Sequence, residues 1–124
     1  MNTIAYFEIQ SSKPEELIQF YSTLFQWKFE KEENLPHGYW RILNAGINGG
    51  LLQRPAKIPP QEFGANAFVC SIEVEDFDSI SKKITDAGGR ITLPKFKIPK
   101  KCYQGYFVDP EGNSFGIFEV NTDL

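Results

Sequence analysis

The residues with the most familiar catalytic chemistry do not form a recognisable set. The one histidine, His37, could act as a general base, but it lies in a Leu-Pro-His-Gly turn with no readable partner to orient its ring. Cys70 and Cys102 have the spacing of neither a disulfide framework nor a metal site, so we expect free thiols. Ser114 follows a Gly-Asn pair that is not a nucleophile elbow. The sequence therefore does not favour a serine or cysteine nucleophile.

A second group of residues that could act in acid–base chemistry lies on two predicted strands. Alternation over residues 4–10 puts Tyr6 and Glu8 on one strand face, and alternation from residue 67 puts Ser71 and Glu73 on one face of another strand. Carboxylates facing a dry pocket can have their pKa values pushed apart, which suits proton abstraction next to a carbonyl. Glu8, Glu73 and Tyr6 are therefore candidate catalytic residues. The alternative is that the two acids are solvated strand residues.

Aromatic residues supply 15% of the 124 residues, led by 11 Phe, which is a high share. Rings with a few polar anchors suit a planar or amphipathic organic ligand, and an acidic pair would favour a cationic one. The rings that we expect in such a pocket are Tyr6, Trp40, Tyr103 and Phe118, with Glu8, Ser71 and Glu73 as polar groups. The alternative is that these rings fill the core between sheets.

Composition excludes several classes of partner. The formal net charge is −3, and the lysine cluster at positions 95, 97, 100 and 101 is predicted to lie in a proline-containing loop, so nucleic acid is not expected. No run approaches the roughly 20 apolar residues that span a bilayer, and the sequence shows no N-terminal apolar stretch preceded by positive charge. We therefore expect a soluble, cytoplasmic protein without a membrane partner.

The same order of elements is predicted twice. Ser12 is the predicted N-cap of a helix with an apolar stripe, because Pro14 lies near its first turn and Glu15 takes the capping-box position. Trp27 opens the next strand. A second helix over residues 76–86 ends at Gly88-Gly89, and a strand follows at 90–93. Residues 38–53 (GYWRILNAGINGGLLQ) and 105–119 (GYFVDPEGNSFGIFE) each read as an aromatic strand, an Asn/Gly turn and a further strand. The prediction is one domain with module 1 at 1–55, a proline-rich linker at 56–64 and module 2 at 65–124.

Two motifs carry a family resemblance. Phe20-Tyr21 followed by residues 24–27 (LFQW) resembles the FY-x-x-LFGW segment of the vicinal oxygen chelate superfamily, and Asp109–Asn113 resembles its DP-[DE]-GN turn. This superfamily includes glyoxalase I, extradiol dioxygenases and bleomycin-resistance proteins. The resemblance spans essentially the whole chain and implies an α+β fold of two βαβββ modules, with curved mixed sheets around a cleft and commonly a homodimer.

Metal-dependent members of this superfamily place His, Glu or Gln ligands in the first and last strands of each module. By this resemblance, the first-strand positions fall on Tyr6 and Val69. The last-strand positions fall on Gly116 and near Leu51, with a register uncertainty of one residue. Three of these four residues are apolar or glycine, so the familiar metal site is expected to be absent. A shifted metal site using Glu8 and Glu73 stays a weaker alternative.

The leading hypothesis is a glyoxalase/bleomycin-resistance-like protein that binds a small organic molecule without the usual metal and without a cofactor. The candidate ligand-binding residues are Tyr6, Glu8, Trp40, Val69, Ser71, Glu73, Tyr103, Gly116 and Phe118. One alternative is a lyase-like or isomerase-like enzyme with an unorthodox metal site or metal-free acid–base catalysis. Another is a structural or partner-binding module whose cleft is filled by side chains.

Overall fold

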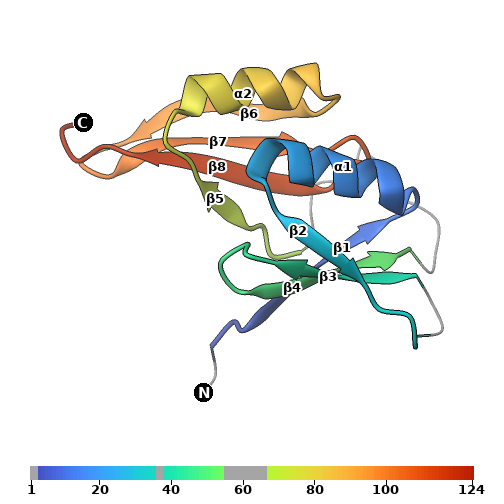
Figure 1. The fold of residues 1–124 in the computed structure, drawn as a ribbon. Coiled ribbons are helices and arrows are strands. Elements are labelled where there is room, and N and C mark those ends of the chain that lie inside the picture. Colours follow the sequence, from blue (N-terminus) through green and yellow to red (C-terminus); the bar gives the residue numbers. More distant parts are fainter. Residues whose placement is uncertain (1–2, 36–37, 55–66) are drawn as a thin grey trace. The chain divides into compact units, whose positions relative to one another are not determined.

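The computed structural model describes residues 3–35, 38–54 and 67–124. The predicted linker and His37 lie outside the described residues. The chain divides into two compact units, Met1–Pro59 and Pro60–Leu124. Each unit contains one helix and one four-stranded mixed sheet in the order strand, helix, three strands (Figure 1). This confirms the predicted α+β class and the two βαβββ modules.

The first unit consists of β1 (Tyr6–Ser11), α1 (Pro14–Phe25), β2 (Lys28–Lys31), β3 (Tyr39–Leu43) and β4 (Asn48–Gln53). Its strand order is β1-β4-β3-β2, and only the β1–β4 pair is parallel. One sheet face meets the apolar stripe of α1, because Ile42 and Leu51 are buried together with Leu17, Tyr21 and Leu24 of the helix. The opposite face of this sheet carries the polar strand residues.

The second unit consists of β5 (Ser71–Glu73), α2 (Phe77–Asp86), β6 (Arg90–Ile98), β7 (Cys102–Val108) and β8 (Ser114–Val120). Its strand order, β5-β8-β7-β6, repeats that of the first unit, with a parallel β5–β8 pair. Phe77 and Ile84 of α2 are buried, as are the sheet residues Phe107, Phe115 and Ile117. The two sheets therefore share one topology, in which the first and last strands of each module lie side by side.

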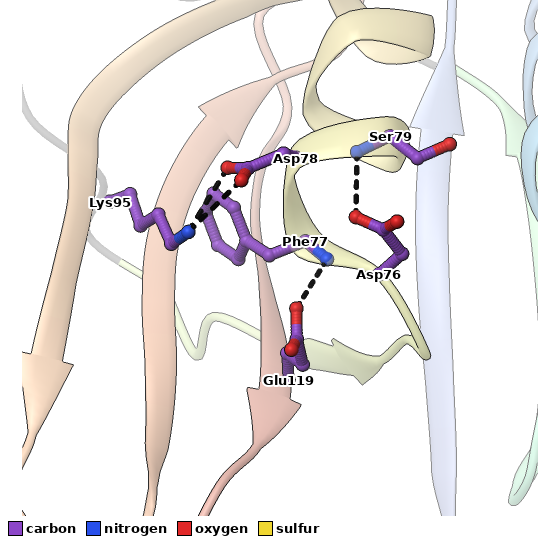
Figure 2. A network of polar contacts seen from close by, with 6 residues as sticks. All are labelled: Asp76, Phe77, Asp78, Ser79, Lys95 and Glu119. Carbon is purple, nitrogen blue, oxygen red and sulfur yellow. Dashed lines mark hydrogen bonds and ion pairs between the residues drawn. The ribbon is translucent and has the colours of Figure 1, made fainter. Parts of the chain in front are cut away.

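The two helices begin differently. At α2, the Asp76 carboxylate accepts a hydrogen bond from the Ser79 backbone amide at 3.0 Å, and Glu119 of β8 accepts one from the Phe77 amide at 2.7 Å (Figure 2). At α1, the prediction that Ser12 is the N-cap is wrong. Lys13 is the N-cap without a side-chain cap, and the hydroxyl of Ser11 accepts a bond from the Lys13 amide. A serine two residues before a proline resembles a helix start, but α1 begins at Pro14, so its N-cap position falls on Lys13, one residue after Ser12.

The loop predicted for the lysine cluster is also wrong in part. Strand β6 runs on to Ile98, so Lys95 and Lys97 belong to a strand rather than to a loop. Pro94 is tolerated because β6 is an edge strand, and the pairing with β7 shifts register on either side of Leu93. The Lys95 ammonium lies 4.1 Å from the centre of the Tyr103 ring and pairs with Asp78.

The DP-E-GN turn has a structural role. Asp109 is buried, and its Oδ1 accepts hydrogen bonds from the backbone amides of Glu111 and Asn113, while its Oδ2 accepts one from the Asn113 side chain. Gly112 adopts a φ of 85°, which favours glycine. These bonds lock the turn that returns β7 into β8. No helix in the described part of the chain is long and apolar enough to cross a membrane.

Candidate functional site

The sheet face opposite α1 carries a cluster of two tyrosines, one acid and one glycine. Strand pairing aligns Glu8 of β1 with Gly50 of β4, and Gly50 with Arg41 of β3. Tyr6 and Tyr39 lie diagonally on either side of this row, and their hydroxyl groups form a very short hydrogen bond. We call Tyr6, Glu8, Tyr39 and Gly50 the tyrosine cluster.

Gly50 is needed for this arrangement. A Cβ atom at position 50 would overlap the hydroxyl end of Tyr39 and would lie 2.7 Å from the Tyr6 hydroxyl oxygen. The two phenols therefore occupy the space into which a larger residue at position 50 would project its side chain. Of the two residues within the predicted last-strand position of module 1, Gly50 aligns with Glu8 on the face opposite α1, whereas Leu51 aligns with Ile9 and is fully buried on the α1 side.

The electrostatics of the cluster keep Tyr39 protonated. Partial burial raises the pKa of Tyr39 well above its ordinary value, and the hydrogen bond with Tyr6 and the nearby Glu8 charge raise it further. Arg41 lowers it, but only as the last contribution, and its guanidinium is paired with Glu32 at 2.9 Å. Tyr39 is therefore a neutral hydrogen-bonding phenol and not a phenolate base.

A second cluster occupies the equivalent place in the second unit. Strand pairing aligns Ser71 of β5 with Gly116 of β8, and Gly116 with Tyr106 of β7. The Gln104 side-chain amide donates to the Ser71 hydroxyl at 3.1 Å. A Cβ atom on Gly116 would lie 2.5 Å from that hydroxyl oxygen and 2.7 Å from the amide nitrogen. We call Ser71, Gln104, Tyr106 and Gly116 the serine cluster.

Aromatic rings border the serine cluster. Tyr106 stacks against Phe96 of β6, with ring centres 6.5 Å apart and planes inclined by 26°. Glu73 and Phe118 form the next aligned pair on the same face, beside Gln104. This face therefore combines a hydroxyl, an amide and one carboxylate with π-faces, which suits a planar organic molecule.

The structure brings together only some of the candidate residues. Tyr6 and Glu8 share one face in the first unit, and Ser71, Glu73, Gly116 and Phe118 share one face in the second. Trp40 aligns with the buried Leu51 and so lies on the α1 side. Tyr103 aligns with Glu119 on the α2 side, where Lys95 covers its ring. Val69 precedes β5 and is exposed.

Four residues of the two clusters were not among the site residues predicted from the sequence: Tyr39, Gly50, Gln104 and Tyr106. The register of β3 and β7 against their neighbours decides which side chains share a face, and a shift of one residue moves every side chain to the other face. A usable signal was present in the alternation of Tyr39 and Arg41 with the apolar Trp40 and Ile42. Gln104, the one side-chain amide in the aromatic-rich segment Cys102–Val108, was a second such signal.

A separate depression lies at the end of the second sheet. It has a volume of about 360 Å³ and is lined by Glu73, Val74, Glu75, Glu119 and Val120. Glu119 already serves the start of α2, and no aromatic residue contributes to the lining. This depression therefore does not match the aromatic pocket expected from composition.

The comparisons with known proteins agree with this architecture. Residues 3–117 match the family model described as "Glyoxalase/Bleomycin resistance protein/Dioxygenase superfamily". Because the match covers most of the sequence, the chain belongs to this superfamily, which confirms the resemblance found in its motifs.

The relatives differ from this chain in length and sequence. The chain is 25% identical over 119 residues to the protein named "Putative glyoxylase CFP32" of Mycobacterium bovis and Mycobacterium tuberculosis. This alignment covers 94% of the chain and 45% of the relative, so the chain spans about half the length of the curated proteins that it matches.

Solved structures share the fold at low identity. The fosfomycin resistance protein FosX from Listeria monocytogenes has a TM-score of 0.77 at 10% identity, with 98% of this chain and 93% of that chain covered. A hypothetical protein from S. aureus has a TM-score of 0.71 at 19% identity, with 96% and 98% covered. FosX has also been crystallised in complex with Mn(II) and sulfate.

The residues of this chain do not fit the superfamily's metal. Glycine at positions 50 and 116 offers no side-chain donor, and neutral hydroxyl and amide groups cover both places. Tyr6 is engaged with Tyr39, and Val69 has no donor atom. Within the described ranges, no three His, Cys, Asp or Glu side chains gather closely enough to hold a metal ion.

Proposed function

We propose that this chain binds a small organic molecule on the sheet faces opposite its helices, without the divalent metal of the superfamily. The observation that carries the proposal is the pair of glycine-centred clusters. In both units, a last-strand glycine that aligns with a polar residue of the first strand, Gly50 with Glu8 and Gly116 with Ser71, is covered by neutral hydroxyl or amide groups. Such groups bind carbonyl or hydroxyl groups of a ligand by hydrogen bonds rather than through a shared metal.

The surroundings of the clusters support an aromatic or otherwise planar ligand. Tyr6 and Tyr39 in one unit, and Phe96, Tyr106 and Phe118 in the other, offer ring faces next to the polar groups. Aromatic stacking adds binding energy of about 0.5–1.5 kcal/mol beyond the area that is buried.

A screen by NMR tests this proposal. The intact, isotope-labelled protein is mixed with a library of planar heterocycles, and amide shifts are followed at Glu8, Gly50, Ser71 and Gly116. We expect saturable shifts at one or both clusters, weakened at least about fivefold by Tyr6→Phe or Gln104→Leu, since each removes one hydrogen bond worth about 1 kcal/mol. Tyr103→Phe, on the α2 side, serves as the matched control. If shifts map elsewhere, or if the control weakens binding equally, the proposal fails.

A metal-free lyase or isomerase is the second candidate function, favoured by the placement of Glu8 beside the tyrosine pair. A carboxylate could accept a proton next to a carbonyl group while a neutral phenol donates a hydrogen bond to the carbonyl oxygen. Under this alternative, solvent-exchange NMR should detect deuterium exchange at the α-carbon of a bound ketone, and Glu8→Gln should abolish that exchange. If bound ketones show no exchange above the rate in buffer, this alternative is discarded.

The assembly that we propose is a cytoplasmic homodimer. Sheet edges and exposed apolar residues such as Phe68, Leu93 and Phe96 support association, and the two free thiols fit a reducing compartment. Light scattering at micromolar concentration should give the mass of two chains. A mass of 14.2 kDa, that of one chain, would contradict the dimer.

A further inference from the structure

The tyrosine cluster presents one donor and one acceptor that the described protein groups leave unused. The hydroxyl pair of Tyr6 and Tyr39 has two protons, of which one lies between the oxygens. The other has no acceptor among the residues that the structure describes. The Glu8 carboxylate likewise makes no hydrogen bond or ion pair within the described part of the chain. A ligand that reaches this face therefore meets a phenolic O–H beside a carboxylate.

The positions of these groups limit the chemistry of the ligand. Tyr6 and Glu8 are two residues apart on β1, so their side chains leave the same face about 7 Å apart along the strand. Both side chains are long enough to reach the same polar edge of one ligand. That edge needs an acceptor for the phenol and, next to it, a donor for the carboxylate.

The charge of the tyrosine cluster and the flat rings of its tyrosines restrict the chemical class of the ligand further. The Glu8 carboxylate repels an anionic ligand, and the neutral phenol pair does not offset that charge. Burial and the hydrogen bond with Tyr6 raise the pKa of Tyr39, so the Tyr39 hydroxyl keeps its proton across the physiological range. The tyrosine rings favour a flat ligand. A cyclic amide has these properties, because it is neutral and planar and carries C=O and N–H side by side.

We propose that the tyrosine cluster binds the lactam edge of a planar heterocycle. The lactam oxygen accepts a hydrogen bond from the Tyr6–Tyr39 pair, and the lactam N–H donates one to Glu8. This inference rests on the proposed small-molecule function of the same sheet face, and it adds the ligand class and the role of each group. Gly50 leaves the room in which the phenols take this position.

Two small probes test the donor and the acceptor separately. 2-Pyridone carries the complete lactam edge, whereas N-methyl-2-pyridone keeps the carbonyl group and lacks the N–H. Each is titrated into the intact protein to millimolar concentration, the range expected for such small ligands, with amide shifts followed at Glu8 and Gly50. We expect 2-pyridone to bind about tenfold more tightly, as the loss of one charge-assisted hydrogen bond predicts.

Variants assign the two contacts. Glu8→Ala should make the affinities for the two pyridones equal, and Tyr39→Phe should weaken both, because it breaks the hydroxyl pair. Tyr103→Phe should leave both affinities unchanged. Thermal unfolding of each variant checks that the fold is retained. Glu8→Met, of similar length but without an oxygen acceptor, provides a second variant with the same expected result if Glu8→Ala fails to fold.

The outcomes separate this inference from the proposed function. Equal affinities of the wild-type protein for both pyridones, or a preference that survives Glu8→Ala, would overturn the lactam assignment. Absence of any shift at the tyrosine cluster with either pyridone would also overturn the lactam assignment. If other library members bind at that cluster, the proposed function still holds. If neither the pyridones nor any library member binds at either cluster, the proposed function fails as well.

Discussion

Two adjacent glycines of β4 serve opposite faces of one sheet. A Cβ at Gly49 would meet the ring of Phe7 on the α1 side, whereas a Cβ at Gly50 would meet the tyrosine hydroxyls on the other side. Phe7 packs edge-on against Trp27, so its ring has little room to withdraw. The Tyr39 side chain ends near the surface and can swing away. The same chemical change at neighbouring positions should therefore have different consequences.

We predict that Gly49→Ala lowers the free energy of unfolding by about 1–3 kcal/mol, as expected for overpacking in a core. Gly50→Ala should cost less stability but separate the tyrosine hydroxyls, which would return the pKa of Tyr39 toward its ordinary value. Urea unfolding measures the first effect, and a spectrophotometric titration of tyrosinate measures the second. A Gly50→Ala protein with the tyrosine titration of the wild type would contradict the placement of the pair.

The pKa of Tyr39 makes a prediction for alkaline pH. Because this pKa is raised in the fold, the folded chain retains a proton that the unfolded chain releases above the ordinary tyrosine value of about 10. The stabilisation is thus complete below that pH and is lost as the pH rises above it. The free energy of unfolding should fall more steeply with pH in the wild-type protein than in Tyr39→Phe. Equal slopes in urea unfolding above pH 10 would rule out the raised pKa.

At the scale of elements, the start of each helix depends on different chemistry. The two carboxylates at α2 come from distant positions, Asp76 at the helix start and Glu119 on β8, and each accepts from one backbone amide. Glu119 therefore ties the helix to its sheet as well as satisfying a free amide. Helix α1 has no comparable side-chain cap.

We predict that Asp76→Ala lowers the free energy of unfolding by about 0.5–2 kcal/mol, the usual cost of losing an N-cap. Ser12→Ala is the comparison at α1 and should cost less than Asp76→Ala, because Ser12 is not the N-cap of that helix and the bond that its hydroxyl accepts from Arg54 is exposed. Chemical denaturation of both variants checks the difference. A larger loss for Ser12→Ala than for Asp76→Ala would reverse the assignment of caps.

The elements were predictable from sequence to the extent that local patterns control them. The stripe of Leu17, Tyr21 and Leu24 and the turn at Asp109–Asn113 predicted the order of elements, which the structure confirms. Strand β6 was cut short in the prediction because Pro94 is a breaker in most strands, whereas tolerance of proline at a sheet edge depends on topology. The end of a strand at the edge of a sheet is therefore not fixed by local sequence.

The candidate site was less predictable, because it depends on pairing between distant strands. Tyr6 and Glu8 could be placed on one face by alternation alone. Their neighbours Tyr39 and Gly50 could not, since their positions depend on the register of β3 and β4 against β1. Trp40 shows the same limit, because an aromatic residue expected in a pocket lies on the α1 side of its sheet.

At the scale of the whole molecule, the two units repeat one topology and one arrangement of polar side chains around a glycine. Each places a glycine beside its first strand and neutral groups above that glycine. A side chain at either glycine would meet the phenols in the first unit, or Ser71 and Gln104 in the second, and these groups would have to move to admit it. Each unit thus combines the βαβββ topology with neutral hydrogen-bonding groups over a last-strand glycine.

Metal uptake tests the central claim most directly. The purified, intact chain is mixed in turn with Mn(II), Zn(II) and Ni(II), and bound metal is measured after desalting and by calorimetry. Our account predicts no stoichiometric, tight binding of any of these ions. One equivalent of metal per chain, bound tightly and lost on Glu8→Ala or Glu73→Ala, would contradict it.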